Sequence, residues 1–265
     1  MTDQKISLTG HLTELRKRLL FSVGALMTGF IVSFNFSEDL FRALIFPMKF
    51  KLVFIMQSPF VNFIPSKINN TDLIFTAPGE AFWMHLKVSF MAGLFLAMPF
   101  ILYQLWKFIS PGLKAKEKKY AAPFVVSATL LFFIGAAFCF LFILPFAMGF
   151  LLTYKTESLT PMLSAGNYVS FCVKFILAFG AVFELPIIII FLTRMGFVTT
   201  RTLAKNRKYA ILAAFIIAAM LTPTPDAFNQ LLMAVPIMLL YEVGILFSKL
   251  LVRKKKETAQ TEKVR

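Results

Sequence analysis

The chain has 265 residues, of which 58% are hydrophobic, only 15% are charged and 33 are Phe. A soluble domain needs a larger share of polar residues to cover its surface, so this composition excludes one and indicates a membrane protein. The formal net charge of +15 would also suit a nucleic-acid-binding protein, and the position of the charges decides between the two.

The basic residues are gathered in four short segments that alternate with segments holding few of them. Of the 28 Lys and Arg residues, 21 fall in residues 1–18, 107–119, 193–208 and 249–265. The intervening segments hold four in 37–78, one in 153–165 and none in 222–228. Cytoplasmic loops carry such an excess, so the pattern predicts cytoplasmic termini and an even number of spans. A nucleic-acid patch would not alternate with apolar segments, and we expect no nucleic-acid partner.

Six apolar stretches lie between the charged segments, and we expect each to form a membrane-spanning helix. They cover approximately residues 19–36, 80–108, 121–152, 167–193, 209–221 and 227–250. A helix needs about 20 residues to cross the hydrocarbon, so the stretch from Tyr209 to Leu221, which reaches only about 20 Å, predicts local thinning of the bilayer. The sequence therefore predicts one all-α membrane domain over residues 1–265, with its first span retained rather than cleaved.

Residues 37–78 form the one long segment on the external side. Prolines, among them Pro47, interrupt it, and its longest uncharged run is too short to cross the membrane. A seventh crossing would also invert every later loop against the charge pattern. We expect an amphipathic cap that lies at the membrane surface.

The sequence contains no motif for catalysis. His11 and His85 lie far apart, and Cys139 and Cys172 lie in apolar stretches, which fits small buried side chains better than a metal site or a disulfide framework. No phosphate-binding Gly-rich loop and no nucleophile motif is present. We therefore expect no enzymatic activity, no metal ion and no cofactor.

Among the acidic residues in the basic segments, Glu14 and Glu117 are the candidates for a function. Glu14 precedes the first span in "HLTELRKRLL". Either it pairs with Arg18, four residues on, and supports the helix, or it has a function of its own. Glu117 lies in "PGLKAKEKK", where the residues alone favour a solvated loop that sets the orientation of the chain.

Other acidic residues lie in or beside the apolar stretches. Glu184 is ten residues from Arg194, about 15 Å deep, where an ionisable group marks either a structural pair with another helix or a functional polar site, and the residues favour the site. Glu242 lies nearer the cytoplasmic edge, and both interpretations stay open for it. We expect Glu80 to extend toward the outer membrane surface, and Asp226 to cap the helix that follows it.

Five segments of the chain, in order, resemble the TatC family, the core subunit of the twin-arginine protein translocase. They are "HLTELRKRLL" at 11–20, "ILYQLWKFISPGLKAKEKK" at 101–119, "AFGAVFELP" at 178–186, "LTPTPDAFNQ" at 221–230 and "LYE" at 240–242. The resemblance implies six helices in a concave, glove-like bundle, in a bacterial cytoplasmic (inner) membrane. It also implies a receptor for the twin-arginine signal peptides of folded cargo proteins.

The resemblance further implies roles for particular residues. Glu14 and Glu117 would bind the arginine pair, and Arg16 and Phe108 would assist recognition. Two carboxylates suit two guanidinium groups, because Arg binds carboxylates in a fork that Lys cannot form. In relatives the loop acid is often followed by Arg, whereas Lys118 follows Glu117 here.

Implied roles extend to the rest of the bundle. Pro47 would be structural in the external cap, and Glu184 would face the concave surface inside the bilayer. Gln230 and Glu242, with the short fifth and sixth spans, would form the docking side for single-span partners of the TatA and TatB type. The family works in multimeric complexes driven by the proton motive force. Two other classes remain open: a small-solute or ion carrier that uses Glu184, and a passive assembly scaffold.

Overall fold

The computed structural model describes residues 8–54, 61–65, 73–109, 121–153, 162–222 and 226–264. The helices are α1 (Leu8–Phe34), α2 (Ser37–Lys49), α3 (Glu80–Ile109), α5 (Ala121–Phe138), the π-helix η2 (Cys139–Ile143), α6 (Leu144–Thr153), α7 (Ala165–Val182), α8 (Leu185–Arg194), α9 (Thr200–Lys205), α10 (Arg207–Leu221) and α11 (Ala227–Val264). The strands are β1 (Phe50–Phe54), β2 (Val61–Pro65), β3 (Leu73–Ile74) and β4 (Leu163–Ser164). The predicted fold class, an all-α membrane protein, is confirmed for the described residues.

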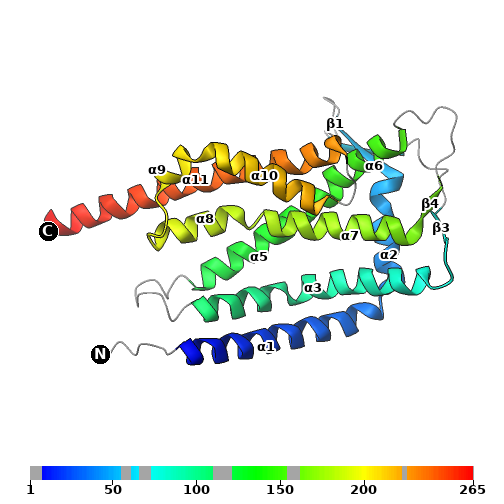
Figure 1. Ribbon diagram of the computed structural model, residues 1–265, viewed down its shortest axis with the longest axis horizontal. Coiled ribbons are helices and arrows are strands. Elements are labelled where there is room, and N and C mark those ends of the chain that lie inside the picture. The colour runs from blue at the N-terminus through cyan, green and yellow to red at the C-terminus, as the bar shows by residue number, and fades with distance from the viewer. Residues whose placement is uncertain are drawn as a thin grey trace.

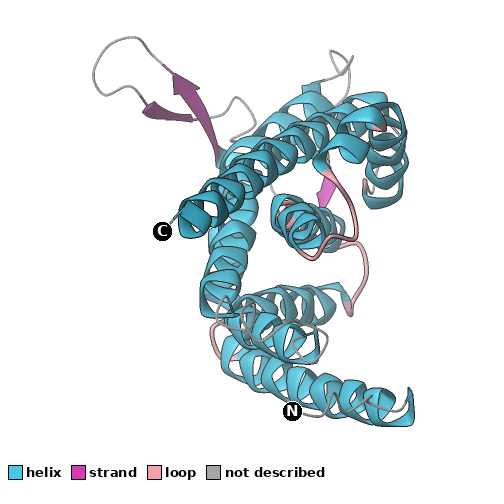
Figure 2. Cartoon of the chain, turned by 90° about the vertical axis from the view of Figure 1, so that its left-hand side faces the viewer, coloured by secondary structure: helices cyan, strands magenta, loops and turns pink. Residues whose placement is uncertain are grey.

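The long helices run in nearly one direction, and α2 lies across them at one end of the bundle (Figure 1). The start of α1, the end of α3, the start of α5, helix α9 and the end of α11 all lie at the opposite end. The view along the helices shows α2 and the long helices following an arc, with α7 within it (Figure 2). The two ends of the bundle therefore differ: α2 lies at one, and the start of α1 and the end of α11 lie at the other. The basic residues of α9 and of the end of α8 lie at the second end.

Five helical segments are long and apolar enough to cross a membrane: Leu12–Phe34, Glu80–Ile109, Ala122–Leu152, Ala165–Arg194 and Ala227–Leu251. The chain is therefore a multi-pass membrane protein. The stretch predicted as a short fifth span forms α10, whose 15 residues extend about 22 Å. At the other end of the chain, α1 begins at Leu8, well before the predicted start of the first span.

Two of the membrane-spanning segments depart from a regular α-helix close to a proline. In η2, the N–H of Leu144 donates to the carbonyl of Cys139, five residues back, and Pro145 follows with no N–H of its own. Similarly, α7 ends at Val182 and α8 begins at Leu185, just before Pro186. The fourth predicted span therefore consists of two helices, and Glu184 lies at the joint between them.

The external segment differs from the prediction in two ways. Pro47 was predicted to interrupt it, but Pro47 is buried inside α2, near the end of that helix, beside the buried Leu44 and Met48. The hydroxyl of Tyr168 donates a hydrogen bond of 2.8 Å to the Leu44 carbonyl, which ties α2 to α7. After α2 the chain forms an antiparallel hairpin, β1 with β2, that the sequence analysis did not predict.

Glu80 joins the outer ends of α3 and α7. Its Oε2 accepts hydrogen bonds from the Thr76 N–H at 2.6 Å, the Thr76 hydroxyl at 2.8 Å and the Ala77 N–H at 3.3 Å. Its Oε1 accepts from the Ser164 hydroxyl and from the Gly166 N–H at 2.6 Å. Strands β3 and β4 pair in parallel beside it. Glu80 therefore binds the chain segments at the outer ends of α3 and α7, and its extension toward the outer membrane surface stays a prediction.

Helices α1 and α3 cross at two glycines. A Cβ atom on Gly29 would lie 2.6 Å from the carbonyl oxygen of Gly93, and one on Gly93 would lie 2.5 Å from the Phe30 nitrogen. Backbones this close require glycine on both sides, as in small-residue contacts between membrane helices. Much of the rest of α1 is exposed, including Leu12, Leu19 and other large apolar side chains.

Helix α7 forms the centre of the core. Phe175, Phe179 and Cys172 are fully buried, and Cys139 of η2 is also a buried free thiol. A Cβ atom on Gly180 would lie 2.6 Å from the Phe132 ring, so α5 packs tightly on α7. Both cysteines are thus small core side chains, as the sequence predicted.

We expect the substitution Gly29→Ala to destabilise the protein by about 1–3 kcal/mol, because the added methyl group meets the α3 backbone rather than a movable side chain. Gly24→Ala is the matched control, since it lies on the same helix and its Cβ would have no atom within 4 Å. Thermal unfolding of the purified protein in detergent measures both. Equal losses of stability for the two variants would contradict the close crossing.

Candidate functional site

Glu14 lies in the second turn of α1 and forms an ion pair with Arg18, one turn further on. The Arg18 Nη2 atom is 3.1 Å from the Glu14 Oε1 atom, and the two side chains are 25% and 22% exposed for Glu14 and Arg18. The other guanidinium nitrogen, Nη1, donates to the Oε1 atom of Gln104 on α3 at 3.3 Å. The predicted helix-supporting pair is therefore present, and it also connects α1 to α3.

The predicted assisting residues lie on the same two helices. Phe108 is half-buried and lies four residues after Gln104, so both residues share one face of α3. Arg16 is exposed and lies two residues after Glu14, which directs it to another side of α1. The last turns of α3 and the first turns of α1 thus gather Glu14, Arg18, Gln104 and Phe108 at one end of the bundle.

Glu117 lies outside the described residues. It falls in the connection between Ile109, where α3 ends, and Ala121, where α5 begins. Helices α1 and α3 pack side by side along their length (Figure 1). The chain that carries Glu117 therefore leaves the same helix end that holds Phe108 and Gln104.

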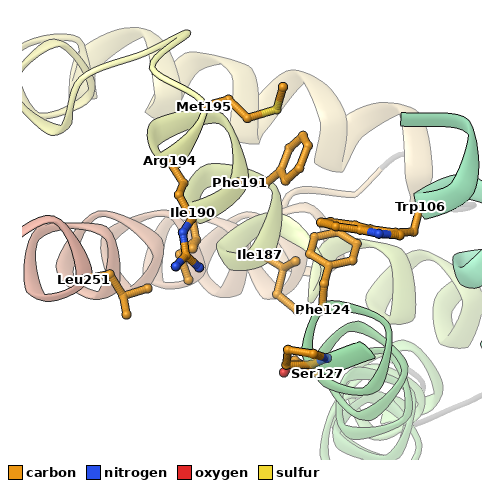
Figure 3. Close-up of a pocket in the computed structure, with 10 residues that line it drawn as sticks. Trp106, Phe124, Ser127, Ile187, Ile190, Phe191, Arg194, Met195 and Leu251 are labelled. Carbon is orange, nitrogen blue, oxygen red and sulfur yellow. The ribbon is translucent and has the colours of Figure 1, made fainter. Parts of the chain in front are cut away.

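An apolar cavity of about 340 Å³ lies beside this end of α3 (Figure 3). Trp106, Phe124 and Phe191 form its aromatic wall, with ring centroids 4.7 Å apart for Trp106 and Phe124. Phe191 contacts both rings at 5.9 and 5.7 Å. Ser127 and Arg194 also line the cavity. Trp106 follows Gln104 by two residues, so the cavity and the Glu14 pair lie on different sides of α3.

Glu184 lies at the joint between α7 and α8 and is half-buried. Its Oε1 atom is buried and accepts no hydrogen bond from the described residues. Its side chain also does not cap α8, although the residue occupies the position of the cap. This unbonded Oε1 atom differs clearly from the oxygens of Glu80, both of which are bonded.

The side chains predicted for partner docking, Glu242 and Gln230, form bonds with other residues of this chain. Both carboxylate oxygens of Glu242 on α11 bind the Arg207 guanidinium at the start of α10, at 2.6 and 2.7 Å. The Gln230 amide donates to the Phe215 carbonyl of α10 at 3.2 Å. These bonds hold α10 against α11.

Asp226 precedes α11. Its Oδ1 atom accepts a hydrogen bond from the Asn229 N–H at 2.7 Å, and its Oδ2 atom accepts one from the Asn229 side-chain amide at 2.9 Å. The backbone bond is that of an N-cap residue, which satisfies one of the free N–H groups in the first turn of the helix. The cap fixes the start of α11 directly after α10.

The comparisons of this chain with known proteins all find the same family, over nearly the whole chain. The family model for the Sec-independent protein translocase protein (TatC) matches residues 10–236. The chain belongs to the TatC family. The TatC protein of Magnetococcus marinus is 41% identical over 98% of this chain and 90% of its own length. That of Aquifex aeolicus is 39% identical over 94% of this chain and 98% of its own length.

Solved structures agree with the family. A crystal structure of the twin-arginine translocase receptor TatC is 38% identical, with a TM-score of 0.75, and the match covers 91% of this chain and 98% of the solved one. A second, in the detergent DDM, is 37% identical with a TM-score of 0.76 over 90% and 99% of the two chains. The chain is therefore a TatC-type subunit of the Sec-independent translocase, a transport component and receptor rather than an enzyme.

Sequence reasoning missed three features of this TatC chain. Gln104 was not singled out, although a polar residue in an apolar stretch one turn before Phe108 could have drawn attention to it. The Glu80 network joins residues more than eighty positions apart, and no local pattern reveals it. The aromatic cavity is also built from residues on α3, α5 and α8, which the sequence does not bring together.

We expect the substitution Glu80→Gln to lower the temperature of unfolding, whereas Glu184→Gln leaves it unchanged or raises it. The amide of Gln presents a donor where both oxygens of Glu80 accept, while the buried oxygen of Glu184 has no bond from the described residues to lose. Thermal unfolding of both variants in the same detergent gives the comparison. A loss for Glu184→Gln as large as that for Glu80→Gln would mean that Glu184 has a structural partner after all.

Proposed function

We propose that this chain is the receptor for twin-arginine signal peptides of folded cargo proteins and that Glu14 and Glu117 bind the two arginines. One observation carries the proposal: the Glu14 carboxylate, partly exposed at the end of the bundle, already binds a guanidinium group, that of Arg18, at 3.1 Å. A carboxylate so placed suits a guanidinium ligand, because charge-assisted bonds are stronger than neutral ones. Arg16 and Phe108 border the site on α1 and α3.

The proposal includes the orientation of the chain. Six helices would span a bacterial cytoplasmic (inner) membrane, with α10 as the short fifth span and both termini in the cytoplasm. The positive-inside rule supports this, since the described parts of the basic segments and both ends of the described chain lie at one end of the bundle (Figure 1). The glove shape that the family implies is supported by the arc of helices in Figure 2.

Partner docking is proposed for α10 and α11. Single-span proteins of the TatA and TatB type would pack on these helices in a multimeric complex driven by the proton motive force. The short α10 supports this, because its outward side chains are exposed and apolar, namely Ile211, Leu212, Ile216, Ile217 and Met220. Gln230 and Glu242 would keep the docking surface in place through their bonds to α10.

The aromatic cavity is proposed to receive the apolar part of the signal peptide. Signal peptides follow their basic region with about 7–15 apolar residues, and the cavity offers an apolar wall at the same end of α3 as the Glu14 site. The rival function, a carrier of small solutes or ions, would rest on the unpaired oxygen of Glu184. Membership of the translocase family does not favour it.

We expect Glu14→Gln and Glu117→Gln each to weaken binding of a twin-arginine peptide by about ten- to hundredfold, since a charged hydrogen bond contributes about 1.5–3 kcal/mol. Binding of the matching twin-lysine peptide should change much less, so each variant loses discrimination. Fluorescence anisotropy of labelled peptides with the detergent-purified protein measures both affinities.

Glu38→Gln is the matched control. Glu38 also pairs with an arginine four residues on, Arg42, but it lies on α2. Its substitution should leave peptide binding unchanged. A wild-type protein that binds the twin-arginine and twin-lysine peptides equally would exclude the receptor function.

We expect Ser127→Trp to fill the cavity and weaken binding of a signal peptide with its apolar segment, while a short peptide holding only the arginine region binds as before. Val126→Trp is the control, because Val126 is the exposed neighbour of Ser127 and does not line the cavity. The same anisotropy measurement serves for both peptides. Equal binding of the long peptide by wild type and Ser127→Trp would place its apolar segment elsewhere.

A further inference from the structure

The carboxylate that is proposed to bind a peptide arginine already has an arginine of its own. Arg18 gives one nitrogen to Glu14 at 3.1 Å and another to Gln104 at 3.3 Å, so its guanidinium bridges two acceptors on two helices. Any cationic group that binds Glu14 while Arg18 keeps its bond must lie beside the positive guanidinium of Arg18, and an arginine fork must in addition share the Oε1 atom with it. Peptide binding and the internal pair therefore oppose one another.

We propose that Arg18 occupies Glu14 in the empty receptor as an internal substitute for a peptide arginine and that the incoming peptide displaces it onto Gln104. This inference rests on the proposed function, because it concerns the same site. It assigns Arg18 and Gln104 to the control of peptide affinity.

The geometry of the pair allows a peptide arginine to replace Arg18 on Glu14. Arg18 makes one bond to Glu14 instead of the two that a fork can make, and its Nε atom is buried without a hydrogen-bond partner among the described residues. A peptide arginine that approaches from the open end can offer both bonds. The internal arginine is therefore held less firmly than the arginine that replaces it.

Gln104 makes the exchange possible. Its side chain is buried, with the residue only 6% exposed, and it is fixed on α3 rather than on the helix of Glu14. When Arg18 leaves Glu14, it keeps this second acceptor, so the displaced guanidinium is not left buried without any partner. Without Gln104, displacement would leave a partly buried charge unpaired.

Competition of this kind lowers the affinity of every cationic peptide by the same factor. The apparent affinity falls with the fraction of receptors whose Glu14 is open, whichever ligand then binds. The ratio between twin-arginine and twin-lysine affinities is set by the bonds of the ligand and stays unchanged. Arg18 therefore lowers the absolute affinity for every peptide, while the fork geometry determines the preference for arginine over lysine.

The test is the substitution Arg18→Gln in the full-length protein, with anisotropy titrations of a twin-arginine and a twin-lysine peptide. An exposed or partly exposed pair at this spacing is weak, so both peptides should bind about two- to fivefold more tightly, with their ratio unchanged. Lys17→Gln removes the same charge one residue away and should give a clearly smaller gain. In a Glu14→Gln background, Arg18→Gln should give no gain at all.

Several outcomes would overturn the inference. Weaker binding by Arg18→Gln with an unchanged temperature of unfolding would make Arg18 a support for Glu14 instead of a competitor, and an equal gain for Lys17→Gln would reduce the effect to net charge. Arg18→Met, which keeps an unbranched side chain of similar length, repeats the test if Arg18→Gln unfolds. Loss of the proposed function itself is distinguishable, because the wild type would then show no preference between the two peptides.

Discussion

The structure depends on one constraint: polar groups inside a bilayer have no water to bond, so each must find a partner in the protein or remain at the ends of the bundle. Glu80 follows this rule most fully, with both oxygens bonded to the backbone and side chains around the starts of α3 and α7. Arg18 shares its bonds between Glu14 and Gln104 near the opposite end. Glu184 is the exception, since its buried oxygen lacks a bond from the described residues. Natural proteins break such rules mostly at functional sites, so a function for Glu184 stays a prediction.

Because hydrocarbon offers no hydrophobic drive between helices, their close contacts depend on shape. Gly29 and Gly93 let α1 approach α3, and Gly180 lets α7 approach the Phe132 ring of α5. The first of these contacts matters for function, since it fixes the helix that carries Glu14 against the helix that carries Gln104. Arg18 and Gln104 lie near one end of two long helices and are joined by a bond of 3.3 Å. The bond can form only if the contact of Gly29 with Gly93 keeps the two helices at a fixed angle. Packing in the middle of the bundle thus supports the geometry of the site.

The sequence predicted what local patterns and charge can encode. The apolar stretches, the short α10, the buried cysteines and the family follow from residue types and their order. The hairpin of β1 and β2, the position of Pro47 inside α2 and the bonds of Glu80 to the start of α7 were missed, because each depends on contacts that form only in the folded chain. For the site, spacing alone identified the pairing of Glu14 with Arg18 but could not add Gln104, which comes from another helix. Glu117 stays a prediction, since it lies outside the described residues.

The net charge of +15 repels cationic peptides at long range, so binding of such a peptide would depend on short-range bonds at the site. In the proposed site, the basic residues around Glu14 would reduce its attraction for other cations, and Arg18 binds it directly. Long-range repulsion falls off within about 10 Å in salt, whereas a fork of two charged hydrogen bonds acts only at contact. In the proposed receptor, a ligand that can form the fork gains more at close range than it loses on approach, and one that cannot is repelled by the same charges. The basic surroundings and the partly exposed Glu14 carboxylate would thus act together to select paired guanidinium groups.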